Sequence, residues 1–254
     1  MNRRTFFQSL SLGLLAAALP GAAMAFDRQH RVTIARLSYT GGNDNPRPGA
    51  IRRLLLEVDK RTSIEVDTDI QTVSPRREEL FEFPMVIWTG DRGFDPLSDE
   101  AIEDLRTYLL AGGFLFIDSA EGLTDGPFME SIRREIQRIF PRRDLVILPR
   151  DHTVHQTFYL IDRPAGRIDI SANFQAVFED NRAAILVNAN DLLGALARDT
   201  FGQWEFDVVP GGERQREMAF RLAINLVMYA LTVDYKADQV HIPFILRRRR
   251  WRVE

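Results

Sequence analysis

The sequence contains no cysteine among its 254 residues, and this absence excludes several kinds of chemistry. Disulfide bonds, thiolate metal sites and a cysteine nucleophile are all ruled out. Histidine is scarce as well, since the chain has only four. Neither a Gly-x-Gly-x-x-Gly fingerprint nor a Walker phosphate loop occurs, so no nucleotide is implied. No internal repeat, low-complexity segment or linker divides the chain. This indicates that the chain forms one domain after the N-terminal segment described next.

Long apolar runs are also missing, and the run at residues 10–19 is too short for a comfortable membrane span. Arg3 and Arg4 precede this run, and Ala23–Ala25 supplies small residues at a cleavage position. We therefore expect residues 1–25 to be a twin-arginine-type signal peptide, with an ordinary secretory signal as the alternative. Cleavage near Ala25 would leave a soluble protein in the periplasm or outside the cell. An uncleaved leader would tether the protein to the membrane.

Basic residues gather at the C-terminal end, whereas the expected domain is acidic. Residues 26–235 carry 25 basic and 34 acidic residues, a net charge of −9, while residues 236–254 carry six and two, a net charge of +4. The tail includes the basic run Arg247–Arg252. Such a tail is either solvated or folded back on the acidic body, or it contacts an anionic membrane surface or an acidic envelope protein. Nucleic acid is not an expected partner of an exported protein with an acidic body.

Strand-like and helix-like segments alternate along the rest of the chain. The clearest unit begins at Ser98, which can cap a helix, and ends at Gly112-Gly113 before an apolar strand. We expect strands at 32–39, 64–72, 85–88, 114–117, 145–148 and 184–187, an antiparallel extension at 154–161 and 174–178, and helices after Pro48, after Ser98, from Pro127 and from about 214 to 231. This order predicts a three-layer, doubly wound α/β domain, spanning residues 26–235, with a mostly parallel sheet.

Five of the apolar runs lead into loops of glycine and polar residues. These loops are Thr40–Asp44, Thr89–Asp91, Asp118–Gly122, Arg150–His152 and Asn188–Asp191. Open parallel sheets bind ligands in a crevice outside the carboxyl ends of their strands. The pattern therefore predicts where a ligand binds more firmly than it predicts a reaction.

Asp118 and Ser119 directly follow the most apolar strand. A strand-to-helix turn of this kind exposes a catalytic side chain in α/β hydrolases, and Ser119 is the candidate nucleophile. The glycines of that motif are missing, because Ile117 and Glu121 occupy their positions. Asp118 is therefore a candidate for catalysis or ligand binding, with helix capping as the alternative.

Two of the four histidines lie together beside a carboxylate in the segment Asp151–His155. His152 and His155 with Asp151 could hold a divalent metal, or His152 could act as a base oriented by a carboxylate. A structural loop is the third interpretation, because the His-x-x-His spacing places both rings on one side only in a helix.

The remaining candidates are expected to form the walls of the crevice. Gly41-Gly42 and Thr89-Gly90 can bring backbone amides close to a ligand. Asn190 and Asp191 add polar groups at the last strand end, and Trp204 could wall a pocket. For each of these residues, turn formation or packing is the competing interpretation.

Several short motifs occur along the chain in an order that is typical of one protein family. They are Thr40-Gly41-Gly42, Phe83-Pro84, Thr89-Gly90, Leu97–Glu100, Gly112–Asp118, Arg133–Glu135, Phe140-Pro141, Leu148-Pro149, Asp151-His152, His155 and Asn225–Thr232. Together these motifs resemble the bacterial family called domain of unknown function 4159, over about Val32 to Val233. The family is similar to class I glutamine amidotransferases, which are flavodoxin-like in fold, and to the trehalose-utilisation ThuA proteins. The amidotransferase reaction does not carry over, because Asp118 and Ser119 stand where the cysteine nucleophile would.

Three functions remain possible. The first is an exported ligand-binding or interaction module of the cell envelope, which keeps an amidotransferase-like crevice without its nucleophile and binds an unidentified small molecule. The second is a metal-dependent or acid–base enzyme, hydrolase-like, that uses Asp118, His152 and His155. The third, an envelope protein that binds carbohydrate, is implied only by the similarity to the ThuA proteins.

Overall fold

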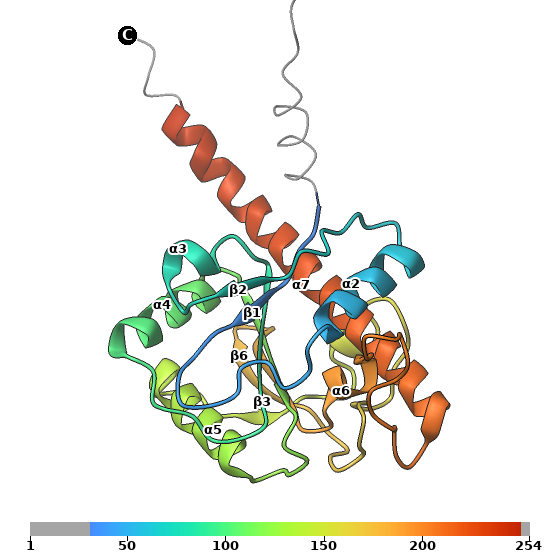
Figure 1. Ribbon diagram of the computed structural model, residues 1–254. Helices are drawn as coiled ribbons and strands as arrows, with labels where there is room; N and C mark the ends of the chain where they lie inside the picture. Colours follow the sequence, from blue (N-terminus) through green and yellow to red (C-terminus); the bar gives the residue numbers. More distant parts are fainter. Residues whose placement is uncertain (1–30, 250–254) are drawn as a thin grey trace, which may run out of the picture. The chain divides into compact units, whose positions relative to one another are not determined.

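Seven β-strands form one sheet, in the order β2-β1-β3-β4-β7-β6-β5 (Figure 1). The computed structural model describes residues 31–249, with side chains through residue 232. The described residues from Val32 onward belong to one unit. The strands are Ala35–Leu37 (β1), Gln71–Val73 (β2), Met85–Gly90 (β3), Phe114–Ser119 (β4), Val146–Ile147 (β5), Gln175–Glu179 (β6) and Arg182–Asn188 (β7).

Helices cover both faces of this sheet (Figure 1). They are Ala50–Arg61 (α2), Arg77–Leu80 (α3), Asp99–Leu110 (α4), Pro127–Ile139 (α5), Leu192–Leu196 (α6) and Gly212–Arg249 (α7), with a 3₁₀ turn at Thr153–His155 (η1). Side chains from α2, α6 and α7 pack on one face, and those from α3, α4 and α5 pack on the other. The predicted α/β class is confirmed: the sheet has helices on both sides.

The direction of the strands follows the predicted pattern. The neighbouring pairs β2–β1, β1–β3, β3–β4 and β4–β7 are parallel. Strand β6 pairs antiparallel with both β7 and β5. The predicted antiparallel strand at 174–178 is confirmed as β6. Because β6 runs against both of its neighbours, β5 runs in the same direction as β7.

The unit α4–β4 shows how the local sequence determines the fold. The Ser98 hydroxyl accepts a hydrogen bond from the Ala101 backbone N–H at 3.2 Å and caps α4, as predicted. Gly113 then lies against the ring of Tyr108, where a Cβ atom would be only 2.3 Å from the ring carbons. A side chain at position 113 would clash, so a glycine is needed for the chain to turn directly into β4.

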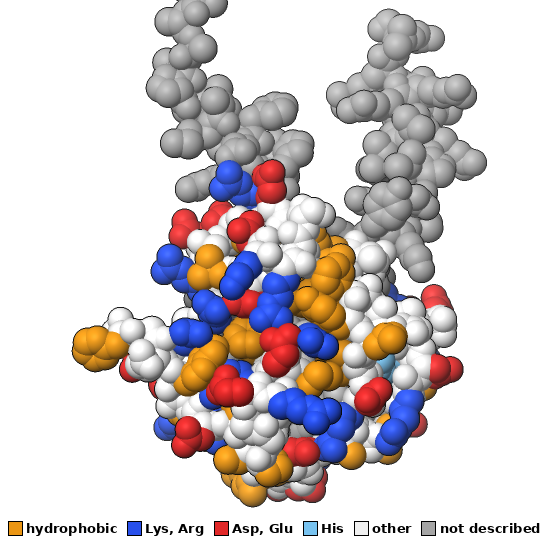
Figure 2. All heavy atoms as spheres, turned by 90° about the vertical axis from the view of Figure 1, so that its right-hand side faces the viewer, with side chains coloured by type: hydrophobic (Ala, Val, Ile, Leu, Met, Phe, Trp, Pro, Cys, Tyr) orange, Lys and Arg blue, Asp and Glu red, His pale blue; other side chains and the backbone are white. Residues whose placement is uncertain are grey.

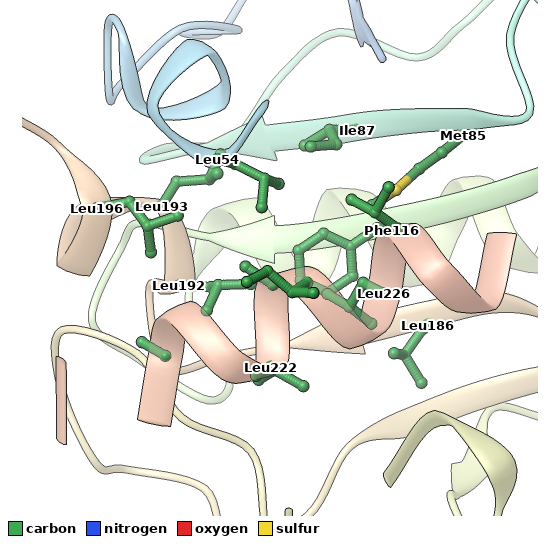
Figure 3. Packing of buried hydrophobic residues seen from close by; sticks show 14 of the residues in the cluster. Leu54, Met85, Ile87, Phe116, Leu186, Leu192, Leu193, Leu196, Leu222 and Leu226 are labelled. Carbon is green, nitrogen blue, oxygen red and sulfur yellow. The ribbon is translucent and has the colours of Figure 1, made fainter. Parts of the chain in front are cut away.

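Two apolar cores form because strand side chains alternate between the faces of the sheet. Ile87, Phe116 and Leu186 point toward α2, α6 and α7, where Leu54, Leu192, Leu193, Leu196, Leu222 and Leu226 pack around them (Figure 3). Trp88 and Val187 point to the other face, toward α4 and α5. Both faces of β3, β4 and β7 are therefore buried, which explains their nearly continuous apolar sequences.

The segment predicted as a strand at 154–161 is not a strand. The chain forms the 3₁₀ turn η1 and then a loop, and the side chain of Asn225 on α7 binds this loop with four hydrogen bonds. Its Oδ1 accepts from the N–H groups of Phe158 and Tyr159, and its Nδ2 donates to the carbonyls of Val154 and Tyr159. The Asn225 side chain thus forms the hydrogen bonds that a neighbouring strand would otherwise form with this backbone. The apolar residues of the segment 154–161 pack against α7 instead of forming a strand.

The first edge of the sheet and the last helix also differ from expectation. β1 is shorter than the predicted strand 32–39, and β2 begins only near the end of the predicted strand 64–72. Between residues 64 and 70 the chain makes one isolated bridge, from Val66 to Val32, among the described residues. Helix α7 continues to Arg249, so residues 236–249 of the predicted basic tail belong to it. The predicted leader and residues 250–254 lie outside the described residues. In the part of the chain that the structure describes, no helix is long and apolar enough to cross a membrane.

We expect the substitution Asn225→Ala to destabilise the protein by about 2 to 4 kcal/mol, because it leaves several buried backbone groups without partners. Urea denaturation monitored by circular dichroism measures this loss. The control Asn45→Ala changes an exposed side chain and should stay within about 0.5 kcal/mol of the parent protein. Equal stability of the two variants would show that Asn225 does not anchor the loop.

Candidate functional site

The five polar loops begin at the same edge of the sheet, as predicted. β1, β3, β4 and β7 are parallel, and β5 has the direction of β7, so all five carboxyl ends point the same way. Within the sheet, β2 lies beside β1 on one side and β3 lies beside β1 on the other, so the strand order reverses between β1 and β3. Such a reversal of strand order is the usual location of a ligand crevice in open α/β sheets.

The chain's own aromatic side chains fill the space after β1 and β3. The ring of Tyr39 packs 4.7 Å from that of Phe94, measured between centroids. Its hydroxyl oxygen lies 2.8 Å from the carbonyl oxygen of Thr89 and 2.9 Å from that of Asn43, and its one proton can be donated to either. Burial, and then the carboxylates of Asp44 and Asp91, raise the pKa of Tyr39 above its ordinary value. The hydroxyl therefore stays protonated and keeps the two loops together.

The predicted glycine walls serve this packing. A Cβ atom on Gly41 would lie 2.3 Å from the carboxyl carbon of Asp95, and one on Gly42 would lie 2.7 Å from the ring of Tyr39. A Cβ atom on Gly90 would lie 2.4 Å from the ring of Phe128. These glycines allow close approach of the protein's own side chains, and a role in ligand binding stays a prediction.

A row of polar side chains crosses the ends of β3, β4 and β7. Thr89 is in register with Asp118, and Asp118 is in register with Asn188, so all three point to the face of α2, α6 and α7. Each is at most 1% exposed. Thr89 Oγ1 and Asn188 Oδ1 have no hydrogen-bond partner among the described residues. The predicted position of Asp118 at the centre of the strand ends is therefore correct, but the row is closed to solvent.

Asp118 holds the start of helix α6. Its Oδ1 accepts from the Leu192 N–H and from the Asn188 side-chain amide, both at 2.9 Å, and its Oδ2 accepts from the Leu193 N–H at 2.8 Å. Burial, and next the nearby charge of Asp191, raise the pKa of Asp118 to about 7 against these hydrogen bonds. Capping, which was the alternative interpretation of Asp118, is the role that its contacts support.

Asp191 is the centre of a buried ion cluster. Its carboxylate accepts from Arg47 Nη2 at 2.6 Å, from Arg167 Nε at 2.5 Å and from the Gly194 N–H at 3.0 Å. Both guanidinium groups also lie near the ring of Phe206. Neither arginine was predicted from the sequence, because they are 144 and 24 residues away from Asp191 and belong to no recognisable motif.

Ser119 is not arranged as a nucleophile. Its side chain is fully buried, and its hydroxyl accepts only a weak 3.4 Å hydrogen bond from the Glu121 N–H. No imidazole or carboxylate among the described residues hydrogen-bonds to it. A serine nucleophile needs an adjacent base, so the contacts of Ser119 do not support its predicted catalytic role, which stays a prediction.

His152 lies at the other end of β7 from Asp118. Its ring packs 5.5 Å from that of Tyr229 and 5.7 Å from that of Phe178, measured between centroids. Tyr229 and Phe178 both contact Ala183, at the beginning of β7. The prediction that His152 joins Asp118 at the carboxyl ends is therefore wrong. The chain leaves edge strand β5 and crosses over the face of the sheet beneath α7.

The predicted metal site is not assembled. His152 Nδ1 accepts from the Val154 N–H and caps η1, while the ring of His155 packs against that of Phe174. Asp151 is exposed. Burial is the main cause that lowers the pKa of both histidines. Within the described residues, no group of three or more His, Cys, Asp or Glu side chains is placed to hold a metal ion.

Asn190 and Trp204 have structural contacts outside the polar row. Asn190 Oδ1 accepts from the N–H groups of Ile170 and Ser171, and its Nδ2 donates to the Ser171 carbonyl, which shapes the preceding loop. Trp204 lies between the guanidinium groups of Arg198 and Arg216 and lines a cavity of about 180 Å³. This cavity lies on the face that carries α2 and the first turns of α7, where acidic and basic side chains alternate (Figure 2).

An open cavity of about 210 Å³ does lie at the carboxyl ends, on the α5 side of β7. Its polar lining consists of Thr124, Asp125, Arg133, Ser171, Asn173 and Gln175. Met129 and Val187 form apolar walls. We call it the strand-end cavity. A larger cavity of about 280 Å³, between loop 162–169 and the start of α7, contains no predicted site residue.

The lining of the strand-end cavity has free hydrogen-bonding groups. Within the described residues, the side-chain amides of Asn173 and Gln175 have no partner. Arg133 Nη2 pairs with the Asp125 carboxylate at 2.5 Å at the edge of the cavity. No sequence motif marks these residues as a binding site, because single amides in loops carry no signal beyond turn formation.

The raised pKa of Asp118 predicts a pH effect on stability. In the native state the Asp118 carboxyl holds its proton more tightly than in the unfolded chain. Native molecules therefore bind more protons than unfolded ones between about pH 4 and about pH 7. The free energy of unfolding falls as the pH rises through that range. We expect the parent protein to lose about 1 kcal/mol or more over this range relative to Asp118→Asn, which cannot ionise.

Urea denaturation across this pH range measures the difference. The control Asp59→Asn removes an exposed carboxyl group and should retain the pH dependence of the parent protein. Parallel curves of stability against pH for the parent protein and Asp118→Asn would contradict the raised pKa.

Comparison with known families gives a match over residues 33–231 to a family described as a domain of unknown function, DUF4159. Comparison with curated proteins gives no match. The matched range contains all seven strands, Asp118, Asp191 and the strand-end cavity. Because it covers more than half of the chain, the protein belongs to the DUF4159 family.

Proposed function

We propose that this protein is an exported binding module of the cell envelope, with an amidotransferase-like fold that has lost its nucleophile, and that it takes up a small polar molecule in the strand-end cavity. The observation that carries this proposal is a contrast between two sets of side chains. Asp118 and Ser119 are buried, and His152 lies at the other end of the strands. The side-chain amides of Asn173 and Gln175, in contrast, have no hydrogen-bond partner within the described part of the chain and line an open cavity.

The amidotransferase-like and ThuA-like part of the proposal is supported by the topology. The strand order reverses between β1 and β3, and helices lie on both faces of a largely parallel sheet. Asp118 and Ser119 end β4, at the position where the related enzymes carry their nucleophile. In this chain the position serves to fix helix α6, which is consistent with a fold whose crevice no longer performs that reaction.

The cavity lining favours a neutral ligand rich in hydroxyl groups. Amides and hydroxyls can both donate and accept hydrogen bonds, which suits the hydroxyls of a carbohydrate. The ion pair of Arg133 with Asp125 keeps the local charge balanced, so neither a cation nor an anion is preferred. Apolar walls with a few placed polar groups are typical of small-molecule sites, and the volume suits a ligand smaller than a drug-sized compound.

An acid–base enzyme is the weaker candidate. The pKa of Asp118, raised to about 7, is suited to proton transfer near neutral pH. Both of its oxygens, however, accept hydrogen bonds from the protein, and the predicted partners His152 and His155 lie against the rings of Tyr229 and Phe174. The geometry therefore favours binding over catalysis.

The ligand proposal is tested with glucose, galactose and N-acetylglucosamine as probes, by thermal shift and calorimetry. We expect at least one sugar to bind, and we expect Asn173→Ala and Gln175→Ala each to weaken its binding by about tenfold through the loss of hydrogen bonds. The matched controls Asn45→Ala and Gln137→Ala should bind as the parent protein does. A parent protein that binds none of the probes, or variants that bind equally well, would contradict the proposal.

Export is tested independently of the ligand. In the full chain, we expect Arg3→Lys with Arg4→Lys to block export, because the twin-arginine route requires the arginine pair. Cell fractionation and N-terminal sequencing check this result, with Phe26 as the expected first residue of the exported protein. Unchanged export of the double variant would assign the ordinary secretory route, and retention of the parent protein in the cytoplasm would refute export. Contact of the run Arg247–Arg252 with an anionic surface stays a proposal from sequence.

A further inference from the structure

A second cavity, lined by arginines, lies at the edge of the sheet on the face of α2. Its volume is about 230 Å³, and it is bounded by β1, β2, the loop before α2 and the first turn of α2. Arg36, Arg47 and Arg52 line it together with Asn45 and Thr72, and no carboxylate is among its lining residues. We call it the arginine cavity. It is separate from the strand-end cavity, with which it shares no residue.

Two of the three guanidinium groups are held in place by the fold. Arg36 Nη1 pairs with the Asp44 carboxylate at 2.7 Å, and its Nη2 donates to Thr72 Oγ1 at 2.9 Å. Arg47 Nη2 pairs with the buried Asp191 at 2.6 Å. The side chains of Arg36 and Arg47 are only 14% and 11% exposed. Their positions are therefore set before any ligand arrives, which lowers the entropic cost of binding.

The charge around the arginine cavity is not balanced. Asp191 is shared between Arg47 and Arg167, so one carboxylate faces two guanidinium groups. Asp118 also acts on Arg47, but it carries only a partial negative charge near neutral pH, since burial raises its pKa to about 7. Arg52 is exposed and has no hydrogen-bond or ion-pair partner within the described residues. A net positive charge is therefore left for a ligand at this cavity.

Free donors accompany this charge. Arg36 has five N–H donors, and its bonds to Asp44 and Thr72 leave its Nε and one Nη2 proton without a partner in the described chain. Arg52 keeps all five of its donors. Paired N–H groups of guanidinium match the oxygen spacing of phosphate and sulfate, and charge-assisted hydrogen bonds of this kind are stronger than neutral ones.

From this geometry we infer that the arginine cavity is a binding site for a tetrahedral oxyanion, either free or as a phosphate group on a larger molecule. Arg36 and Arg47 supply prearranged positive charge, and Thr72 holds Arg36 in position. Arg52 closes over the anion from the first turn of α2. The inference does not depend on the proposed sugar site, because the residues of the two cavities are different.

The inference is tested with the full-length protein, which is titrated with inorganic phosphate. Calorimetry and ¹H–¹⁵N NMR detect the binding. We expect saturable binding, with shifted amide signals at Gly49, Ile51 and Arg52. Arg52→Gln should weaken binding about fivefold to tenfold, and Thr72→Val should weaken it about twofold to threefold. Both residues are exposed, so these variants should fold.

The matched control is Arg142→Gln, which removes an exposed arginine that lies outside the arginine cavity. It should bind phosphate as the parent protein does. Absence of saturable binding, or an equal loss in Arg142→Gln and Arg52→Gln, would overturn the inference, because the effect would then be general electrostatic attraction.

Vesicles that contain phosphatidylglycerol distinguish the two sources of the anion. Binding to these vesicles that phosphate displaces and that Arg52→Gln weakens would assign the site to a lipid headgroup. Phosphate binding without vesicle binding would assign it to a soluble phosphate compound. The site would be refuted if the parent protein does not bind phosphate and if Arg52→Gln binds the vesicles as strongly as the parent protein does.

Discussion

The buried carboxylate of Asp191 is the interaction on which the arrangement of the strand ends depends. It joins the loop after β1 through Arg47, the loop before β6 through Arg167, and the start of α6 through the Gly194 N–H. Asp191 has a positive φ of 54°, which is uncommon for a residue other than glycine. Breaking a buried ion pair typically costs about 3 to 5 kcal/mol, because the remaining charge is left without a partner. In this protein, removal of Asp191 would leave two such charges.

Asp118 complements this cluster from the next strand. Because its oxygens accept hydrogen bonds from the N–H groups of Leu192 and Leu193, the end of β4 is part of the support for α6. The space after β1 and β3 is likewise occupied, by Tyr39 and Phe94. The usual crevice of an open α/β sheet is thus largely filled by the protein itself. Open volume is found beside it, in the strand-end cavity and the arginine cavity.

These two cavities have opposite chemical character. The strand-end cavity has neutral amides and hydroxyls with a balanced ion pair, whereas the arginine cavity has three guanidinium groups and no carboxylate in its lining. The shared Asp191 cluster supports one of them directly, because Arg47 belongs both to the cluster and to the arginine cavity. The two proposed sites together would suit a polar, phosphate-bearing ligand or two separate ligands.

The sequence by itself determined the α/β class, the cap of α4 and the common edge at which the polar loops begin, because these depend on local periodicity and on short-range contacts. Ser98, Gly113 and the apolar strand 114–119 are of this kind. The tertiary structure alone decided which polar residues meet. The pairing of Asp191 with Arg47 spans 144 residues, and the placement of His152 depends on Asn225 and Tyr229 of α7. Contacts over such separations arise from the packing of whole elements, and no local pattern in the sequence records them.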